Sequence, residues 1–190
     1  MKRSFQLKVV AAAVLMASSM AQAGSAFLNG TPITGDGSID NPYLMGVIGA
    51  SPATLFVSLG GPSNMFFFES ADFTIPTTST VSGVANTYSL TFGATNLIDI
   101  SGLTIDVWNN SHPNGTFLSS SFLGNNSTTD IGLLSAGSYH IDISGYLGPN
   151  AVGGQSSVAL QALPVPEPET YVMLLAGLGL VGFSLRRRET

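Results

Sequence analysis

The sequence has no cysteine, and its long central part has no positively charged side chain. The lack of cysteine excludes disulfides, cysteine nucleophiles and thiolate metal sites. Residues 24–165 carry a net charge of −8 from eight acidic side chains, whereas the six basic residues lie near the ends: Lys2, Arg3, Lys8, Arg186, Arg187 and Arg188. Nucleic-acid binding is excluded, because it needs Lys and Arg to displace counterions from phosphates.

The first 23 residues have the three parts of a secretory signal peptide. A positive start precedes an unbroken apolar run over residues 9–17. Ala21 and Ala23 form a small-x-small cleavage site, so Gly24 is the expected new N-terminus. The pattern predicts an N-terminal signal helix that engages the Sec translocon and signal peptidase. The alternative, an N-terminal membrane anchor, is disfavoured because a span needs about 20 apolar residues.

The C-terminal end has its own three-part pattern. Pro166, Glu167 and Pro168 precede an apolar stretch over residues 171–185, which ends at the cluster Arg186, Arg187 and Arg188. We expect a short C-terminal transmembrane helix here, with the arginines held on the cytoplasmic side and the bulk of the chain outside. A plain C-terminal membrane anchor is the alternative.

This order of Pro-Glu-Pro, apolar helix and arginine cluster resembles the PEP-CTERM sorting signal of Gram-negative bacteria. The resemblance covers residues 165–188. It implies that a membrane-embedded exosortase, a cysteine transpeptidase, binds the tail transiently and cuts it near the motif. It also implies that the protein is passed to the cell surface or to an exopolysaccharide matrix.

The residues between the two end signals predict one all-β domain. Short runs with alternating apolar side chains are separated by Gly-, Pro- and Asn-rich turns, which is typical of an antiparallel β-sandwich of jelly-roll or immunoglobulin-like topology. We therefore predict a signal peptide at 1–23, a sandwich at 24–163 and a sorting tail at 164–188. Strands are expected at 53–59, 64–75 (one bent strand or two), 87–92, 97–108 (with a bulge or bend at Gly102), 116–123, 137–146 and 155–163. The segment 24–52 is expected to be a loose arm or an irregular edge strand.

A second resemblance concerns the sandwich itself, which is similar to the FxDxF-type PEP-CTERM proteins. The hallmark falls on residues 84–88, where its three positions hold Val84, Asn86 and Tyr88. The stretch 134–145 resembles the Leu-x-x-Gly-x-Tyr strand entry of that family. No established biochemical activity is implied.

Candidate ligand sites are few. The loop 35–41 offers Asp36 and Asp40 as oxygen donors, which suits Ca²⁺, although the loop lacks the spacing of a standard calcium motif. A Gly/Asp turn is the simpler interpretation, and otherwise no cofactor is expected. Trp108, beside two asparagines, is a candidate sugar-stacking platform or a residue that closes the core.

No catalytic set is evident. His112 lies in a predicted loop, and His140 is expected to face solvent from a strand. Asp99 and Asp106 share one predicted strand run without a second acid across a cleft. We therefore predict a non-enzymatic protein that is exported through the inner membrane, transiently anchored, and then located at the surface or in an exopolysaccharide or biofilm matrix. The alternative is a carbohydrate- or Ca²⁺-binding adhesion module.

Overall fold

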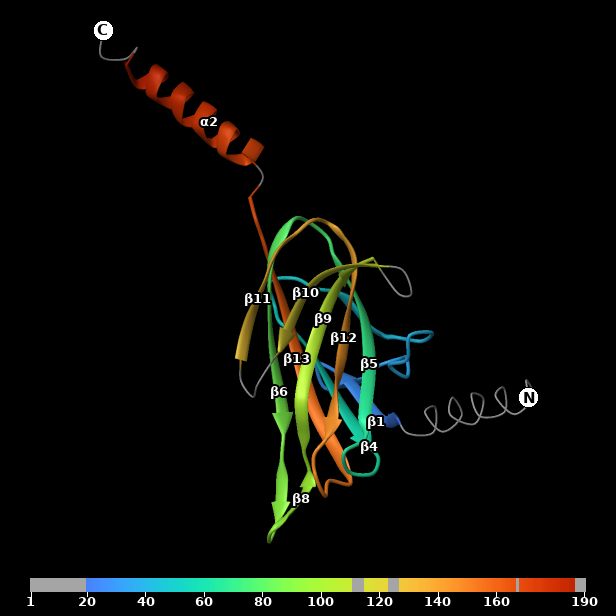
Figure 1. The fold of residues 1–190 in the computed structure, drawn as a ribbon. Coiled ribbons are helices and arrows are strands. Elements are labelled where there is room, and N and C mark those ends of the chain that lie inside the picture. Colours follow the sequence, from blue (N-terminus) through green and yellow to red (C-terminus); the bar gives the residue numbers. More distant parts are fainter. Residues whose placement is uncertain (1–19, 111–114, 123–126, 167, 187–190) are drawn as a thin grey trace, which may run out of the picture.

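The computed structural model describes residues 20–110, 115–122, 127–166 and 168–186, and within them the chain forms two packed β-sheets followed by a helix (Figure 1). The all-β sandwich predicted from the sequence is therefore confirmed. The sheets are mixed rather than purely antiparallel, because β3 and the first residues of β1 run parallel to β5. The predicted N-terminal signal helix falls on residues 1–19, which lie outside the described residues.

One sheet has the strand order β10-β9-β12-β5, with β3 beside β5. Its strands are β3 (Tyr43–Val47), β5 (Phe66–Ile75), β9 (Ile100–Asn109), β10 (Thr116–Phe122) and β12 (Gly137–Leu147). Strand β12 is central and pairs with β5 and β9 over nearly its whole length.

The other sheet has the order β11-β6-β13-β4-β1-β2. Its strands are β1 (Met20–Leu28), β2 (Thr31–Pro32), β4 (Ala53–Gly60), β6 (Ser79–Tyr88), β11 (Ser127–Leu134) and β13 (Gly153–Pro164). The short hairpin of β7 (Leu90–Phe92) and β8 (Thr95–Ile98) extends this sheet at the end opposite to the tail helix (Figure 1).

Strand β1 belongs to both sheets and closes one side of the sandwich. Met20 and Ala21 pair with Phe66 and Phe67 of β5, and from Gln22 onwards the strand pairs with β4 instead. The register shifts between Ala23 and Ser25, so Gly24 lies at a bulge where the strand changes sheets.

Of the two expectations for 24–52, the loose arm is wrong, whereas an irregular edge strand is present as β3. This segment supplies β1, β2 and β3, and it buries Tyr43, Met45 and Ile48 in the core. Its few apolar side chains are spaced irregularly, because β1 crosses between sheets and β3 contains a bulge at Met45. A period-2 search therefore misses strands that are short or bent.

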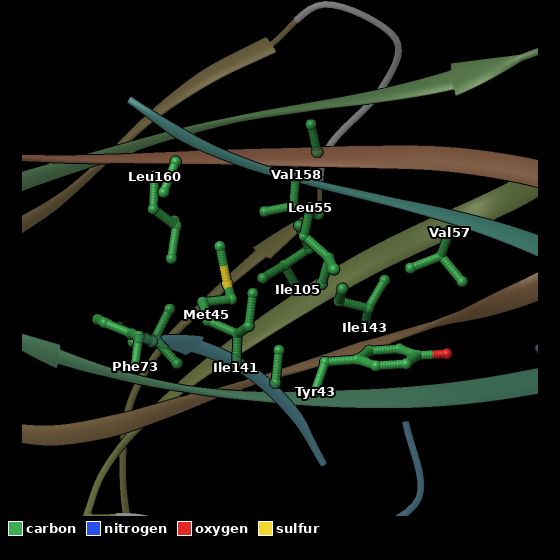
Figure 2. Packing of buried hydrophobic residues seen from close by; sticks show 14 of the residues in the cluster. Tyr43, Met45, Leu55, Val57, Phe73, Ile105, Ile141, Ile143, Val158 and Leu160 are labelled. Carbon is green, nitrogen blue, oxygen red and sulfur yellow. The ribbon is translucent and has the colours of Figure 1, made fainter. Parts of the chain in front are cut away.

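The core lies between the two sheets and is complete without the tail. Within the described side chains, the buried ones all come from residues 43–162, and the partly buried ones that pack on them begin at Ala26. Figure 2 shows Ile141 and Ile143 of β12 facing Leu55 and Val57 of β4, with Met45 and Tyr43 of β3 alongside. We infer that residues 24–165 can fold without α2.

Two predicted strands are placed differently in the structure. The expected strand at 87–92 is split, because β6 ends at Tyr88 and Leu90–Phe92 starts the exposed hairpin. The inward positions of β6 are Val81, Gly83 and Ala85, whose small side chains gave little apolar signal. Strand β11 was missed for a similar reason, since STTDIGLL is polar in its first half.

The strand expected at 97–108 is interrupted at Asp99, which separates β8 from β9. The bulge predicted at Gly102 is confirmed. This glycine has φ +64°, and the β9–β12 register shifts beside it, between Ser144 and Tyr146. A left-handed backbone is cheap only for glycine, which explains this residue inside a strand.

Candidate functional site

The most unusual side chain of the sandwich is a carboxylate inside it. Glu69 alternates with Phe67, Ala71 and Phe73 on the inward face of β5 and is only 2% exposed. Its Oε2 atom is buried and has no hydrogen-bond partner among the residues that the structure describes. Burying a charge without a cationic partner is costly, so such groups are rare outside functional sites.

A loop and one tyrosine enclose Glu69. The Tyr43 hydroxyl hydrogen-bonds its carboxylate, and Tyr43 is itself buried at the start of β3. The carbonyl oxygen of Gly37 accepts a hydrogen bond of 2.7 Å from the Ser70 backbone N–H. This bond holds the loop 35–41 against β5. Oε2 faces Gly37, where an added Cβ would overlap it.

The environment makes Glu69 a weak acid. Desolvation is the main cause that raises its pKa from 4.5 to about 7, and the Asp36 charge adds to it, whereas the Tyr43 hydrogen bond opposes the shift. Burial and the neighbouring Glu69 also raise the pKa of the Tyr43 hydroxyl. Near neutral pH the carboxyl therefore exchanges between a neutral and a charged form.

A pocket of about 300 Å³ lies beside this group, between the β1–β2 hairpin and the segment 33–43. Its lining combines apolar side chains with three polar ones, and consists of Ser25, Ala26, Phe27, Pro32, Ile33, Gly35, Asp36 and Tyr43. Tyr43 thus contacts both the pocket and Glu69. We call this pocket with Glu69 the Tyr43 pocket.

The tyrosine hydroxyl gives a first testable expectation. A hydrogen bond to a charged acceptor contributes about 1.5–3 kcal/mol, and about 1.4 kcal/mol corresponds to one pH unit. Tyr43→Phe should therefore move the titration midpoint of Glu69 upward by about one pH unit, measured by ¹³C NMR of the carboxyl carbon. The exposed tyrosine variant Tyr146→Phe is the matched control. An unchanged midpoint in Tyr43→Phe would contradict the assigned hydrogen bond.

Sequence reasoning did not single out Glu69, although a signal for it existed. The alternation Phe67, Glu69, Ala71, Phe73 in one strand places the glutamate among inward-facing residues. The packing of the segment 35–41 on Glu69 could not be predicted from local sequence, since the hydrogen bond between Gly37 and Ser70 joins residues about 30 positions apart.

The predicted calcium residues belong to the same loop, but they are arranged as a turn. Hydrogen bonds from the Ser38 hydroxyl and from the Ser38 backbone N–H, the latter at 3.0 Å, lower the pKa of Asp36. Both Asp36 and Asp40 are exposed. Within the described ranges, no group of three or more His, Cys, Asp and Glu side chains could hold a metal ion. Calcium binding by Asp36 and Asp40 remains a prediction.

Trp108 lies in an aromatic row on the outer face of the first sheet. The register places Phe117, Trp108, His140 and Asp72 side by side on β10, β9, β12 and β5. The Trp108 ring stacks on His140 at 5.8 Å with an interplanar angle of 9°, and Phe117 meets it edge-on at 5.3 Å. Ligand binding by Trp108 remains a prediction, and His140 occupies one face of the indole.

The prediction that His140 faces solvent is wrong. Its strand register does point it outward, but it is only 2% exposed, because the Trp108 ring covers it and Gly115 packs against its Cε1 atom. Its Nδ1 lies 2.6 Å from the carbonyl oxygen of Asn110. A carbonyl can only accept, so this nitrogen carries the proton.

The other acid–base candidates do not come together. His112 lies outside the described residues. Asp106 lies opposite Asp142 in the pairing of β9 with β12. Asp99 precedes β9, where its backbone N–H donates a hydrogen bond to Gly153 and its carbonyl oxygen accepts one from Gly148. The two aspartates considered as a pair are thus in different structural contexts.

The tail leaves the sandwich at the end of β13. Residues 165–166 connect β13 to the helix α2 (Pro168–Arg186), which stands away from both sheets (Figure 1). Proline suits the first position of a helix, because it has no N–H to leave unpaired there. The described apolar side chains of α2, from Tyr171 to Phe183, are exposed.

The helix expected over 171–185 is therefore present within α2, and its predicted membrane span remains a prediction. Across the described part of the chain, no helix is both long enough and apolar enough to cross a membrane. The 19 residues of α2 extend about 28 Å at 1.5 Å per residue, against a hydrocarbon core of about 30 Å. Gly177 and Gly179 further reduce its apolar surface.

A family model for the PEP-CTERM protein-sorting motif matches residues 164–188. The chain carries a PEP-CTERM sorting signal. The match begins at the last residue of β13 and includes the whole of α2. The motif implies recognition by an exosortase and sorting outside the cell, with the signal held at the membrane.

The match includes every residue predicted for sorting. Pro166 and Pro168 flank Glu167 at the start of α2, and Arg186 ends the helix. Glu167, Arg187 and Arg188 lie within the matched range but outside the described residues. The roles of these side chains, and cleavage after Ala23, remain predictions; Ala21 and Ala23 themselves lie in β1.

The solved structures compared with this chain below share 12–15% sequence identity with it. No curated protein sequence matches it. Among solved structures, it resembles the pre-peptidase C-terminal domain of collagenase from Bacillus anthracis (15% identity, TM-score 0.39, 63% of this chain and 96% of that one). It also resembles Aeromonas hydrophila PliG, a periplasmic lysozyme inhibitor (12%, 0.34, 63% and 98%), and TmCBM61 in complex with β-1,4-galactotriose (14%, 0.33, 58% and 71%). Likeness at this level transfers no activity.

Proposed function

We propose that the protein is a non-enzymatic surface or matrix protein, whose β-sandwich is delivered by the tail and released from it by an exosortase. The observation that carries this proposal is the sorting motif at 164–188, which starts where the sandwich ends. The whole core lies N-terminal to the motif, so a cut near Pro166 leaves the sandwich intact.

The exposed helix α2 is suited to act as a sorting signal rather than as a structural part of the sandwich. None of its described side chains belongs to the core, so removing this part of α2 costs the core no side chain. A short apolar helix followed by arginines is suited to be held at the inner membrane until the exosortase acts. The leader at 1–23 supplies the preceding step, transport by the Sec translocon and removal by signal peptidase.

The acidic sandwich fits an extracellular, hydrated environment. Residues 24–165 carry no Lys or Arg, so the released domain has a net charge of −8. Charge of one sign keeps a protein soluble and opposes self-association. We propose the exopolysaccharide matrix as its destination, where it is a structural component of the biofilm.

The test is localisation in the host after fractionation. Pro166, Glu167 and Pro168 are replaced together by alanine, which keeps the helix and arginines but removes the motif. We expect the parent in the surface or matrix fraction and at least tenfold less of the variant there, with the remainder in the membrane fraction at the mass of the uncut tail. A strain without exosortase should reproduce the variant.

The matched control replaces Pro62, which lies in an exposed turn of the sandwich, and this variant should be sorted like the parent. Equal amounts of the motif variant and the parent in the matrix would exclude sorting by the tail.

A further inference from the structure

The Tyr43 pocket contains acidic groups without a side-chain cation to match them. Residues 24–165 have no Lys or Arg, so none can pair with Glu69. His140 lies on the outer face of the sheet beside Trp108, whereas Glu69 points inward. Asp36 adds a second negative charge at the pocket, and it interacts with both Glu69 and Tyr43.

Strand β1 brings one particular backbone nitrogen to this place. Its parallel pairing with β5 ends at Ala21 and Phe67, two residues before Glu69. The strand then crosses to β4 through the bulge at Gly24, and the next residue, Ser25, lines the pocket together with Asp36 and Tyr43. Gly24 is therefore the residue directly before the pocket lining, on the stretch where β1 leaves the strand that carries Glu69.

The predicted leader cleavage changes the chemistry of that nitrogen. Hydrolysis between Ala23 and Gly24 consumes one water, leaves a carboxylate on Ala23 and converts the amide nitrogen of Gly24 to a primary amine. This amine takes up a proton and becomes an ammonium group at neutral pH, since α-amino groups titrate near 7.7–8.0. Apart from the histidines, it is then the only cationic group in residues 24–165.

We propose that the Tyr43 pocket is an ammonium-binding site whose occupant is the α-amino group of Gly24, formed when the leader is removed. The proposal rests on the leader cleavage included in the proposed function. The ammonium group donates up to three hydrogen bonds, which suits the unpartnered Oε2 of Glu69 and the exposed carboxylate of Asp36. The pocket thus distinguishes the mature domain, with the charge pair, from the precursor, without it.

The composition of the domain makes this testable by a selective chemical change. Residues 24–165 contain no lysine, so an acylating reagent modifies only the α-amino group once tyrosine esters are reversed with hydroxylamine. A chain 24–165 that begins exactly at Gly24 is prepared with a free and with an acetylated amine. We expect acetylation to raise the unfolding equilibrium constant at pH 7.5 about tenfold, measured by urea denaturation.

A double-variant comparison assigns the effect to the pocket. In the double variant Glu69→Gln, Asp36→Asn the acetylation effect should shrink to less than twofold. The matched control Asp130→Asn, which removes an exposed carboxylate on the edge strand β11, should keep the tenfold effect. In the free form the pKa of the α-amino group, followed by the pH dependence of its acetylation rate, should also lie about one unit above its usual value.

Three results would overturn the proposal. Acetylation could change the unfolding constant equally in the parent and the double variant, or in neither. Alternatively, Ca²⁺ could stabilise the free and acetylated forms by the same factor, which would assign the pocket to a soluble cation. These measurements use the isolated domain, so their failure would leave the localisation result unaffected.

Discussion

Replacing Glu69 by glutamine should remove most of the pH dependence of stability at this site. The comparison uses a chain of residues 20–165, which keeps β1 whole and leaves Gly24 within the chain. In this chain the pKa of Glu69 is raised from 4.5 to about 7, mainly by desolvation. The folded state therefore binds the proton more tightly than the unfolded state does between these two pH values.

The sign follows from the linkage between proton binding and unfolding. Stability rises with pH where the unfolded state holds more protons, and here the folded state holds more. The contribution of Glu69 is thus fully present below pH 4.5 and is lost as pH rises through about 7. A shift from 4.5 to about 7 corresponds to about 3.5 kcal/mol at 1.4 kcal/mol per unit, and about 3 kcal/mol of it is lost between pH 4.5 and pH 8.

The measurement is the free energy of unfolding at pH 4.5 and pH 8, from urea denaturation of parent and variant. The parent should lose about 3 kcal/mol more than Glu69→Gln between these values, because glutamine keeps the shape of the side chain but does not titrate. Asp40→Asn, an exposed change in the same loop, should follow the parent. Parallel pH profiles for parent and Glu69→Gln would show that the carboxyl titrates as in the unfolded chain.

The second large effect is expected at Gly37, the residue that faces Glu69. Its φ of +76° favours glycine, and an added Cβ would overlap Oε2 and lie 2.7 Å from Cε2 of Tyr43. A left-handed backbone costs an alanine about 1–2 kcal/mol, and overpacking a filled site costs about 1–3 kcal/mol. Gly37→Ala should therefore destabilise the sandwich by about 3 kcal/mol.

Gly46 provides the matched control, because it separates the two costs. Its φ is +73°, and nothing lies within 4 Å of its added Cβ. Gly46→Ala should cost only the backbone term of about 1 kcal/mol. If thermal and urea unfolding gave equal losses for the two variants, the loop 35–41 would not be packed on Glu69 as the structure shows.

Local pattern explains which parts of the fold were predictable. An apolar run in Ala53–Gly60 and regular alternation in Gly137–Leu147 and Gly153–Pro164 predicted three inner strands within two residues at each end. The alternation of apolar and polar residues is not visible in β6, because two of its inward positions are held by Gly83 and Ala85. It is also lost in β1, which changes sheets at a bulge. In these strands tertiary packing rather than local sequence selects the conformation.

The two candidate sites differ in the same way. The sorting tail is a contiguous pattern, so Pro166, Glu167 and Pro168 were identified from sequence alone and the family match covers them. The Tyr43 pocket joins residues from β1, a loop, β3 and β5, whose proximity depends on the sheet topology. His140 illustrates the limit for single residues: its outward register was predictable, but the covering ring of Trp108 was not.

The position of β13 also determines how the domain bears mechanical load. The strand lies between β4 and β6, and its pairing with β6 continues to Pro164, next to the tail. A pull applied through an attachment at the C-terminus would run along the strand axis, so these hydrogen bonds would be sheared together rather than peeled apart one at a time. A protein tethered by this end in flowing medium is thus loaded in the direction in which a β-strand resists extraction best.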